Sequence, residues 1–322
     1  MSAPSEHDAL RESVRAFLAD PGYSWARLTG ELGLTALVVP ESHGGFGATL
    51  VEAGIALEEA GAALLSAPLL STVTAAAALD PSVPAAAALL PALAEGTTIA
   101  TLALGGDCAV AGGRLTGTVP HVLDGDAADV FVVAAGDDLH AVSAAVADVR
   151  VHPTLDQTRG QATVVFDAAQ ASLVAPGGAG HALDVLHAGL AAESLGVARA
   201  ALALVVEHLR TRRQFGVPLA TFQALRHRVA DLHVLVEQAT STVWYALQAP
   251  AAEFATAAPL AKLTAGEAAW TVTTQAIQLL GGIGFTWEHP AHRYLKRATA
   301  NRVLALDPVA LRRRLLAAAY PG

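Results

Sequence analysis

Three long apolar patterns with helical spacing lie between residues 193 and 295, and they constrain the fold more than any other feature of the chain. In the first, over 195–209, and the second, over 225–243, apolar residues recur in steps of three and four. That spacing places them on one face of a helix, which has to be buried. The third, over 257–280, is apolar on nearly all sides and indicates a helix covered by its neighbours. Long helices joined by short connectors predict an antiparallel bundle.

The two connectors between these helices carry the most distinctive chemistry. The first, over 210–219, reads Arg-Thr-Arg-Arg-Gln-Phe-Gly-Val-Pro-Leu, and Gln223 begins the next helix. The second, over 275–286, reads Gln-Ala-Ile-Gln-Leu-Leu-Gly-Gly-Ile-Gly-Phe-Thr. Cations at the end of a helix suit its dipole, and a glycine cluster lets another backbone or a diphosphate come close. Taken one at a time, each connector is better explained as the end of a helix.

Taken together, in this order and spacing, the connectors resemble the C-terminal domain of the flavin-dependent acyl-CoA dehydrogenases, and the likeness is strongest over 188–298. The resemblance implies an α+β multidomain fold. Its parts are an N-terminal α-helical domain over 1–95, a middle β-barrel domain over 96–176 and a C-terminal four-helix bundle over 177–322. It also implies FAD as the cofactor, an acyl-CoA thioester as the substrate and an electron-transfer flavoprotein as the electron acceptor.

The rest of the chain shows patterns that suit this architecture. Helical spacing predicts three helices in the N-terminal third, over 8–19, 24–32 and 50–62. From 97 to 175, short apolar runs are separated by turns rich in Gly and Asp, which predicts an all-β segment. Its expected strands cover 98–104, 114–118, 130–134, 140–143 and 163–166.

The resemblance assigns cofactor contacts to both connectors. In homotetrameric members of the family, residues of these connectors reach across a dimer interface and bind the diphosphate and adenosine of the neighbouring subunit's FAD. An arginine suits that role, because a planar guanidinium binds diphosphate oxygens with two parallel hydrogen bonds. The corresponding residues of this chain are Arg212, Phe215, Gln223, Gln278, Gly281 and Gly282.

The segment that would face the flavin ring departs from the family pattern. Residues 115–125 align with the family's strand and turn against the isoalloxazine, where a Trp and a Ser or Thr usually stack and hydrogen-bond. This chain has His121 and Leu123 instead. We therefore expect the chain's own barrel to hold a flavin poorly. His121 by itself is more often a structural residue than a general base, although its ordinary pKa suits proton transfer.

The catalytic base of the family also has no counterpart at its usual positions. The family's reaction removes the α-proton of an acyl-CoA thioester while a hydride leaves the β-carbon for the flavin, so it needs a desolvated carboxylate. By resemblance, the two base positions fall on Ala305 and Leu186, which are apolar. The nearest carboxylates are Glu193 and Asp307. Asp307 precedes a proline, an arrangement typical of the N-cap of a helix over 308–318.

These departures lead to one hypothesis and two alternatives. The chain resembles the base-lacking subunit of the heteromeric acyl-CoA dehydrogenases, heterotetramers in which a second subunit supplies the glutamate and the flavin-facing barrel. One alternative is a self-sufficient dehydrogenase with a displaced base, either Glu193 or Asp307. The other is a binding or scaffold protein that keeps the fold without redox chemistry, since a fold does not determine a function.

Composition excludes several other classes of protein. The net charge is −9 and no basic block occurs, which argues against a nucleic-acid partner. The apolar stretch 74–94 is interrupted by prolines, so no membrane span is expected. Residues 1–10 are polar and lack a signal-peptide core, and the single cysteine, Cys108, suits a cytoplasmic protein.

The sequence evidence for a metal site is weak. Glu52, Glu58 and Glu59 share one expected helix, where such carboxylates usually form a solvated face. His289 and His292 are three residues apart but lack a further His or Cys at ligand spacing. We therefore expect no metal site.

Overall fold

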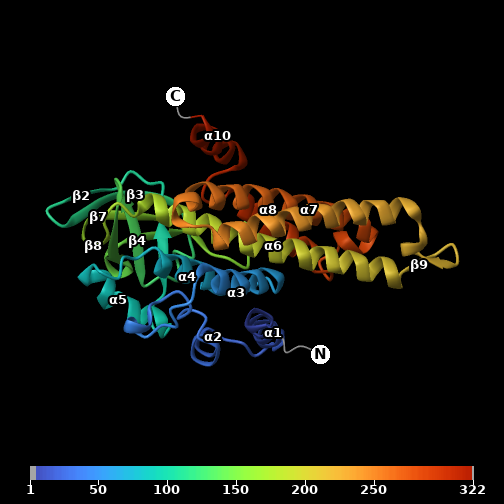
Figure 1. Cartoon of the computed structure of the whole chain (residues 1–322), viewed down its shortest axis with the longest axis horizontal. Coiled ribbons are helices and arrows are strands. Elements are labelled where there is room, and N and C mark those ends of the chain that lie inside the picture. The colour runs from blue at the N-terminus through green and yellow to red at the C-terminus, as the bar shows by residue number, and fades with distance from the viewer. Residues whose placement is uncertain (1–4, 321–322) are drawn as a thin grey trace. The chain divides into compact units, whose positions relative to one another are not determined.

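The computed structural model describes residues 5–320, which form helices, two four-stranded sheets and a final group of long helices (Figure 1). This order confirms the α+β fold class expected from the sequence. The chain divides into two compact units. Unit 1 comprises Met1–Ala56 and Ser66–Gly189, and unit 2 comprises Leu57–Leu65 and Leu190–Gly322.

The three helices predicted in the N-terminal third begin and end close to their predicted positions, and two further helices follow them. Ser5 and Asp8 form a capping box, which starts the first helix slightly earlier than its apolar pattern indicates. Gly33, in the left-handed conformation, ends the second helix. These elements are α1 (Glu6–Ala19), α2 (Trp25–Leu32), the 3-10 turn η1 (Glu41–His43), the first half of α3 (Leu50–Ala62), α4 (Leu69–Ala77) and α5 (Pro84–Ala94).

Two sheets enclose the apolar core of the middle segment. The first has the order β1-β4-β5-β8 and the second β2-β3-β7-β6, and only the β1–β4 pair is parallel among the described strands. Phe131 of the first sheet meets Phe166 of the second edge-to-face, with ring centroids 5.8 Å apart. The strands are β1 (Ala100–Ala103), β2 (Ala109–Ala111), β3 (Arg114–Leu123), β4 (Val130–Ala135), β5 (Asp138–Ser143), β6 (Asp148–Val151), β7 (Gln161–Gln170) and β8 (Ser172–Ala175).

All five predicted strands are present within these sheets. Sequence patterns do not predict β2, β6 or β8, because each is only three or four residues long and two of them have almost no buried residue. Such short strands give no readable alternation of apolar and polar residues.

Unit 2 is the helical bundle that the three apolar patterns predict. The first stripe is buried from Leu195 to Leu209, and the second from Leu232 onward. The elements are α6 (Ala179–Thr211), whose first residues belong to unit 1, β9 (Arg213–Gln214), β10 (Val217–Pro218), the 3-10 turn η3 (Leu219–Thr221), α7 (Gln223–Gln248), α8 (Ala251–Leu280), the 3-10 turn η4 (Gly281–Phe285), α9 (Ala291–Val303) and α10 (Pro308–Ala319).

By length and composition alone, α6 could cross a membrane. Of its most apolar window, 72 % is buried within the structure, as in the core helix of a folded protein. Length and hydropathy are therefore weak evidence for a membrane span here.

Two glycines bring the end of α3 and the middle of α6 into backbone contact within unit 2. A Cβ atom added to Gly196 would lie 1.8 Å from the carbonyl oxygen of Glu58. One added to Gly61 would lie 2.1 Å from the carbonyl oxygen of Glu193. The two backbones therefore cross as closely as helices can, and only glycine fits at either position.

This crossing corrects the expected solvated face on α3. Glu58 and Glu59 are only 4 % and 5 % exposed, because the close approach of α6 covers the helix where they project. Glu58 forms an ion pair with Arg199 of α6, which also donates to Thr240 Oγ1 of α7 at 3.0 Å. The glutamates on α3 thus belong to the interior of unit 2. Glu52 precedes unit 2 and is half-buried.

A second buried ion pair joins α6 to α9. Arg297 Nη1 donates to Glu193 Oε1 at 3.0 Å, and both side chains are at most 2 % exposed. Asn301 Nδ2 donates to Glu193 Oε2 at 2.7 Å. Arg297 also donates to the carbonyl oxygen of Leu65, so the same guanidinium reaches the segment that follows α3. The pair fixes three parts of unit 2 against one another.

Lys262 of α8 holds the turn between α9 and α10. Its side chain is 3 % exposed, and its Nζ donates to the carbonyl oxygens of Leu306 at 2.8 Å and Arg302 at 3.4 Å. Ala305 and Leu306 have φ values of 50° and 86°, which non-glycine residues rarely adopt. Burial lowers the pKa of Lys262 to about 7, although nearby Asp307 acts in the opposite direction.

We expect Gly196→Ala to destabilise the protein strongly. The added methyl group meets backbone rather than a mobile side chain, so the helices have to separate, at a cost of about 1–3 kcal/mol or more. Urea denaturation followed by circular dichroism measures the change. Gly180→Ala is the control on the same helix, because a Cβ there has nothing within 4 Å. Equal midpoints for Gly196→Ala and the wild type would contradict the close crossing.

We expect the stability of the wild type to rise with pH above neutral relative to that of Lys262→Met. Between the folded pKa of about 7 and the ordinary value of 10.5, the unfolded chain still binds a proton that the folded chain has released. Stability therefore increases through this window, by roughly 1 kcal/mol per pH unit. Urea unfolding at pH 7, 8 and 9 measures the slope. A constant difference between the two proteins would show that Lys262 does not titrate there.

Candidate functional site

The structure brings the two connectors to the same end of the helical bundle. Arg228 Nη1 of α7 donates to Gln275 Oε1 of α8 at 2.6 Å, which ties the start of α7 to the end of α8. The hairpin of β9 and β10 lies at this end, where α6 stops and α7 starts (Figure 1). Residues that are about 60 positions apart in sequence therefore share one surface of unit 2.

The first connector presents Arg212 and Phe215 to solvent. Phe215 and Gly216 form the two-residue turn between β9 and β10, with φ values of 53° and 80°. The Phe215 side chain is 91 % exposed, and its ring forms a T-shaped pair with that of Phe222, with centroids 6.1 Å apart. The exposed guanidinium of Arg212 donates no hydrogen bond to any of residues 5–320. An exposed aromatic side chain on a strained turn is typical of a contact site.

The second connector contains three glycines with different requirements. Gly281 has a φ of 65°, which favours glycine. Gly284 is packed, because an added Cβ would lie 2.8 Å from the carbonyl oxygen of Ile277. Gly282 has neither constraint, and a Cβ there would meet nothing within 4 Å. Its lack of a side chain leaves open space beside exposed Gln278, where a group from outside the chain can approach the backbone.

His208 of α6 lies near His289 and Arg212. Burial lowers the pKa of His208, and His289 and Arg212 lower it further. The three groups therefore lie close enough to act on one another, and the guanidinium of Arg212 is the group that suits a bound anion. Gln223, a cofactor contact by resemblance, is exposed, and its amide nitrogen is hydrogen-bonded to His227 Nε2 at 3.0 Å.

The flavin-facing segment of unit 1 offers little to a flavin ring. His121 is exposed at a register shift of β3, with a φ of 54°. Leu123 is 5 % exposed, and its carbonyl oxygen accepts from Thr101 Oγ1 at 2.6 Å. Neither position provides a stacking indole or an exposed hydroxyl. At these two positions the chain therefore lacks the groups that the family resemblance expects against the isoalloxazine.

The two expected base positions carry no acid in the structure. Ala305 lies in the turn after α9, and Leu186 is buried on α6. Glu193 is committed to the buried pair with Arg297. Asp307 caps α10, accepting from the backbone N–H groups of Val309 and Ala310 at 2.8 Å each, and these bonds lower its pKa. The geometry therefore favours structural roles for both candidate carboxylates.

Lys262 is one of the buried polar groups that the sequence patterns do not single out. The detectable signal is a lone cation inside the apolar pattern of α8. Burying a charge is costly unless a partner compensates, so such a lysine indicates a specific acceptor.

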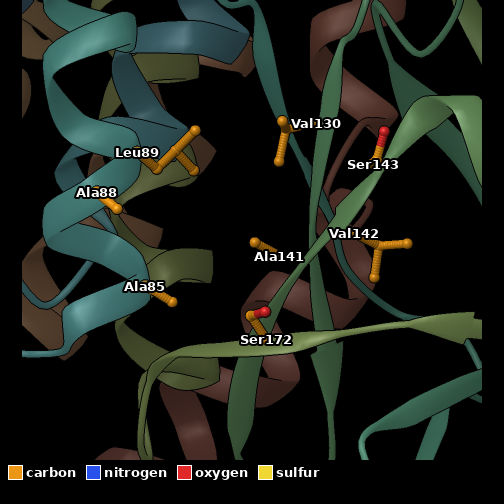
Figure 2. Close-up of a pocket in the computed structure, with 8 residues that line it drawn as sticks. All are labelled: Ala85, Ala88, Leu89, Val130, Ala141, Val142, Ser143 and Ser172. Carbon is orange, nitrogen blue, oxygen red and sulfur yellow. The ribbon is translucent and has the colours of Figure 1, made fainter.

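A separate hollow in unit 1 lies between α5 and the sheet that contains β4, β5 and β8, with a volume of about 380 Å³ (Figure 2). Leu89 and Ala88 project from the helix toward the strands, whereas the side chain of Val142 points away from it. The polar side chains of its lining are only those of Ser143 and Ser172. It therefore offers no group for acid–base chemistry or metal binding. Among residues 5–320, no three His, Cys, Asp or Glu side chains gather as metal ligands.

Comparisons with known proteins identify the family. Residues 4–96 match the acyl-CoA dehydrogenase N-terminal domain, and residues 178–305 match the acyl-CoA dehydrogenase C-terminal domain. The chain is 36 % identical to acyl-CoA dehydrogenase IpdE2 of Mycobacterium tuberculosis over 332 residues, with 98 % of each chain covered. It is 37 % identical to IpdE2 of Mycolicibacterium smegmatis, with coverage of 99 % and 96 %.

Solved structures agree with this result. The steroid ACAD Tcur3481–Tcur3483 G363A variant superposes with a TM-score of 0.89 at 28 % identity, covering 98 % of this chain and 99 % of that one. The ChsE4–ChsE5 complex from Mycobacterium tuberculosis superposes with a TM-score of 0.86 at 25 % identity, covering 99 % of each chain. The expected fold is confirmed, and so is FAD as the cofactor. The chain belongs to the acyl-CoA dehydrogenase family.

Proposed function

We propose that this chain is one subunit of a hetero-oligomeric acyl-CoA dehydrogenase and completes the FAD site of a partner subunit. The observation that carries the proposal is a contrast within the chain. The surface of Arg212, Phe215, Gln278, Gly281 and Gly282 is exposed and ready to bind an anion from outside. Both base positions, in contrast, are apolar, and both nearby carboxylates have structural partners.

When bound, FAD accepts the hydride from the β-carbon of the acyl-CoA thioester. In the proposed assembly, Arg212 holds the diphosphate with its guanidinium. Gly281 and Gly282 let the cofactor approach the backbone, and Gln278 and Phe215 contact the adenosine side. Gln223 lies beside them on α7. The partner subunit supplies the carboxylate that removes the α-proton and the barrel surface that faces the flavin ring.

Relatives suggest the substrate class and the other partners. One similar structure is named a steroid ACAD, and another is a complex of two named subunits, ChsE4 and ChsE5. We therefore propose a steroid-derived acyl-CoA thioester as the first substrate to test. An electron-transfer flavoprotein is the proposed electron acceptor. A cytoplasmic location suits the low cysteine content.

Flavin content per chain tests the proposal. We expect the chain purified alone to lack the flavin absorbance bands, and the complex with its partner to contain about one flavin for every two chains. Arg212→Ala should lower the flavin content of the complex at least about 10-fold, because a charge-assisted diphosphate contact is lost.

Arg150→Ala is the matched control, because Arg150 is exposed and pairs with Asp148 on β6. It should keep the flavin content of the wild type. A full complement of flavin on the isolated chain would contradict the shared site. Absence of flavin with and without the partner would favour the non-redox scaffold instead.

Replacing the candidate displaced bases distinguishes a structural role from catalysis. Glu193→Gln removes the carboxylate charge that pairs with buried Arg297, so we expect a loss of about 3–5 kcal/mol in unfolding free energy. Turnover per bound flavin in the complex should stay at the wild-type value. Asp307→Asn should have a smaller effect, below about 1 kcal/mol, since asparagine is as good an N-cap as aspartate and keeps the accepting oxygen. Loss of turnover at unchanged stability in either variant would identify that carboxylate as the base.

A further inference from the structure

The loop from η4 to α9 exposes three large apolar side chains that the cofactor contacts do not explain. Ile283, Phe285 and Trp287 alternate along the loop and are 48 %, 88 % and 78 % exposed. We call these three residues the apolar edge. Large apolar side chains grouped on a surface mark sites that another molecule covers, and tryptophan is enriched among residues that dominate protein interfaces.

The Trp287 side chain is already oriented within the free chain. Lys296 Nζ lies 4.6 Å from the centroid of its ring, and the His292 ring meets it edge-on at 4.8 Å. His289 Nδ1 accepts from the N–H of Ala291 at 3.2 Å and so fixes the start of α9, the helix that carries His292 and Lys296. An indole held in this way loses little conformational freedom when a partner binds.

Part of the indole remains available to a partner. Lys296 lies over the ring, and none of residues 5–320 accepts a hydrogen bond from Nε1. Lys296 adds positive charge at the ring itself, and the exposed residues Glu288 and Arg293 of the same segment carry opposite charges. The complementary surface is therefore an apolar pocket that contains an acceptor for the indole N–H and carries negative charge at its rim.

The position of the apolar edge indicates which partner has that surface. It continues directly from Gly281 and Gly282, the turn that approaches the partner's cofactor in the proposed assembly. A protein that brings its FAD to these glycines has to extend over the next few residues as well. We propose that the apolar edge docks into the flavin-carrying partner subunit and that Trp287 is its anchor. This inference rests on the proposed function.

Fluorine NMR tests the contact directly. The chain has four tryptophans, so labelling it with fluorotryptophan gives few resonances, and Trp287→Phe identifies the one from Trp287. Adding the unlabelled partner subunit should shift the Trp287 resonance. Trp270, 37 % exposed with Arg302 over its ring, is the internal control, and its resonance should stay in place. An unchanged Trp287 resonance in a complex that forms and binds flavin would overturn the inference and leave the proposed function intact.

Affinity measurements supply the second test. By isothermal titration with the partner subunit, Trp287→Ala should weaken association at least about 30-fold, as expected for an interface anchor. Its melting temperature should match that of the wild type, because the side chain is mostly exposed. Trp270→Ala should leave the affinity unchanged. An equal loss in both variants, or a homodimer of this chain that Trp287→Ala disrupts, would overturn the assignment. Failure of the wild type to form any flavin-containing complex would overturn the proposed function as well.

Discussion

The backbone crossing at Gly61 and Gly196 is the constraint on which the rest of unit 2 depends. Because the two helices touch there, the carboxylates of Glu58 and Glu193 are enclosed and need cations. Arg199 and Arg297 provide them, and each also reaches a further element. A buried ion pair adds little net stability, yet the loss of one member is severe. We therefore attribute to these pairs the fixed positions of α6 and α9, from which both connectors extend.

The local patterns of the chain predict most of its elements but not the contacts between distant ones. Stripes in α6 and α7 and the runs of β3 and β4 depend on neighbouring residues, so they are readable in sequence. The burial of Glu58 depends on Gly196, 138 positions later, and no local pattern shows that pairing. Asp307 is predicted as a helix cap because its signal is local, and the structure confirms it.

The candidate site shows the same limit. The family resemblance singles out Arg212, Phe215 and Gln278, and the structure places their segments at one end of the bundle. Their roles toward FAD stay predictions from the resemblance. Neither the exposure of Phe215 on a strained turn nor the orientation of Trp287 by Lys296 is visible in sequence, because both follow from the packing of residues around them.

The turn around Ala305 keeps its structural support but carries no catalytic group. Lys262 donates to the carbonyl oxygen of Leu306 in this turn, and Asp307 caps the helix that follows. Hydrogen bonds therefore fix the backbone of the turn. The side chain at its centre is nevertheless a methyl group. A turn built with this much support and no reactive group suits a subunit whose catalytic acid comes from elsewhere.

The exposure of Phe215 has a consequence for the life of the chain before it meets a partner. With 91 % of this side chain in water, beside the arginines of the same connector, a chain that lacks its proposed partner leaves a large aromatic side chain uncovered. Surplus chains would therefore be prone to association and aggregation. A cell that uses such a subunit benefits from producing it in step with its partner, so that the ratio of the two is set at synthesis rather than by degradation.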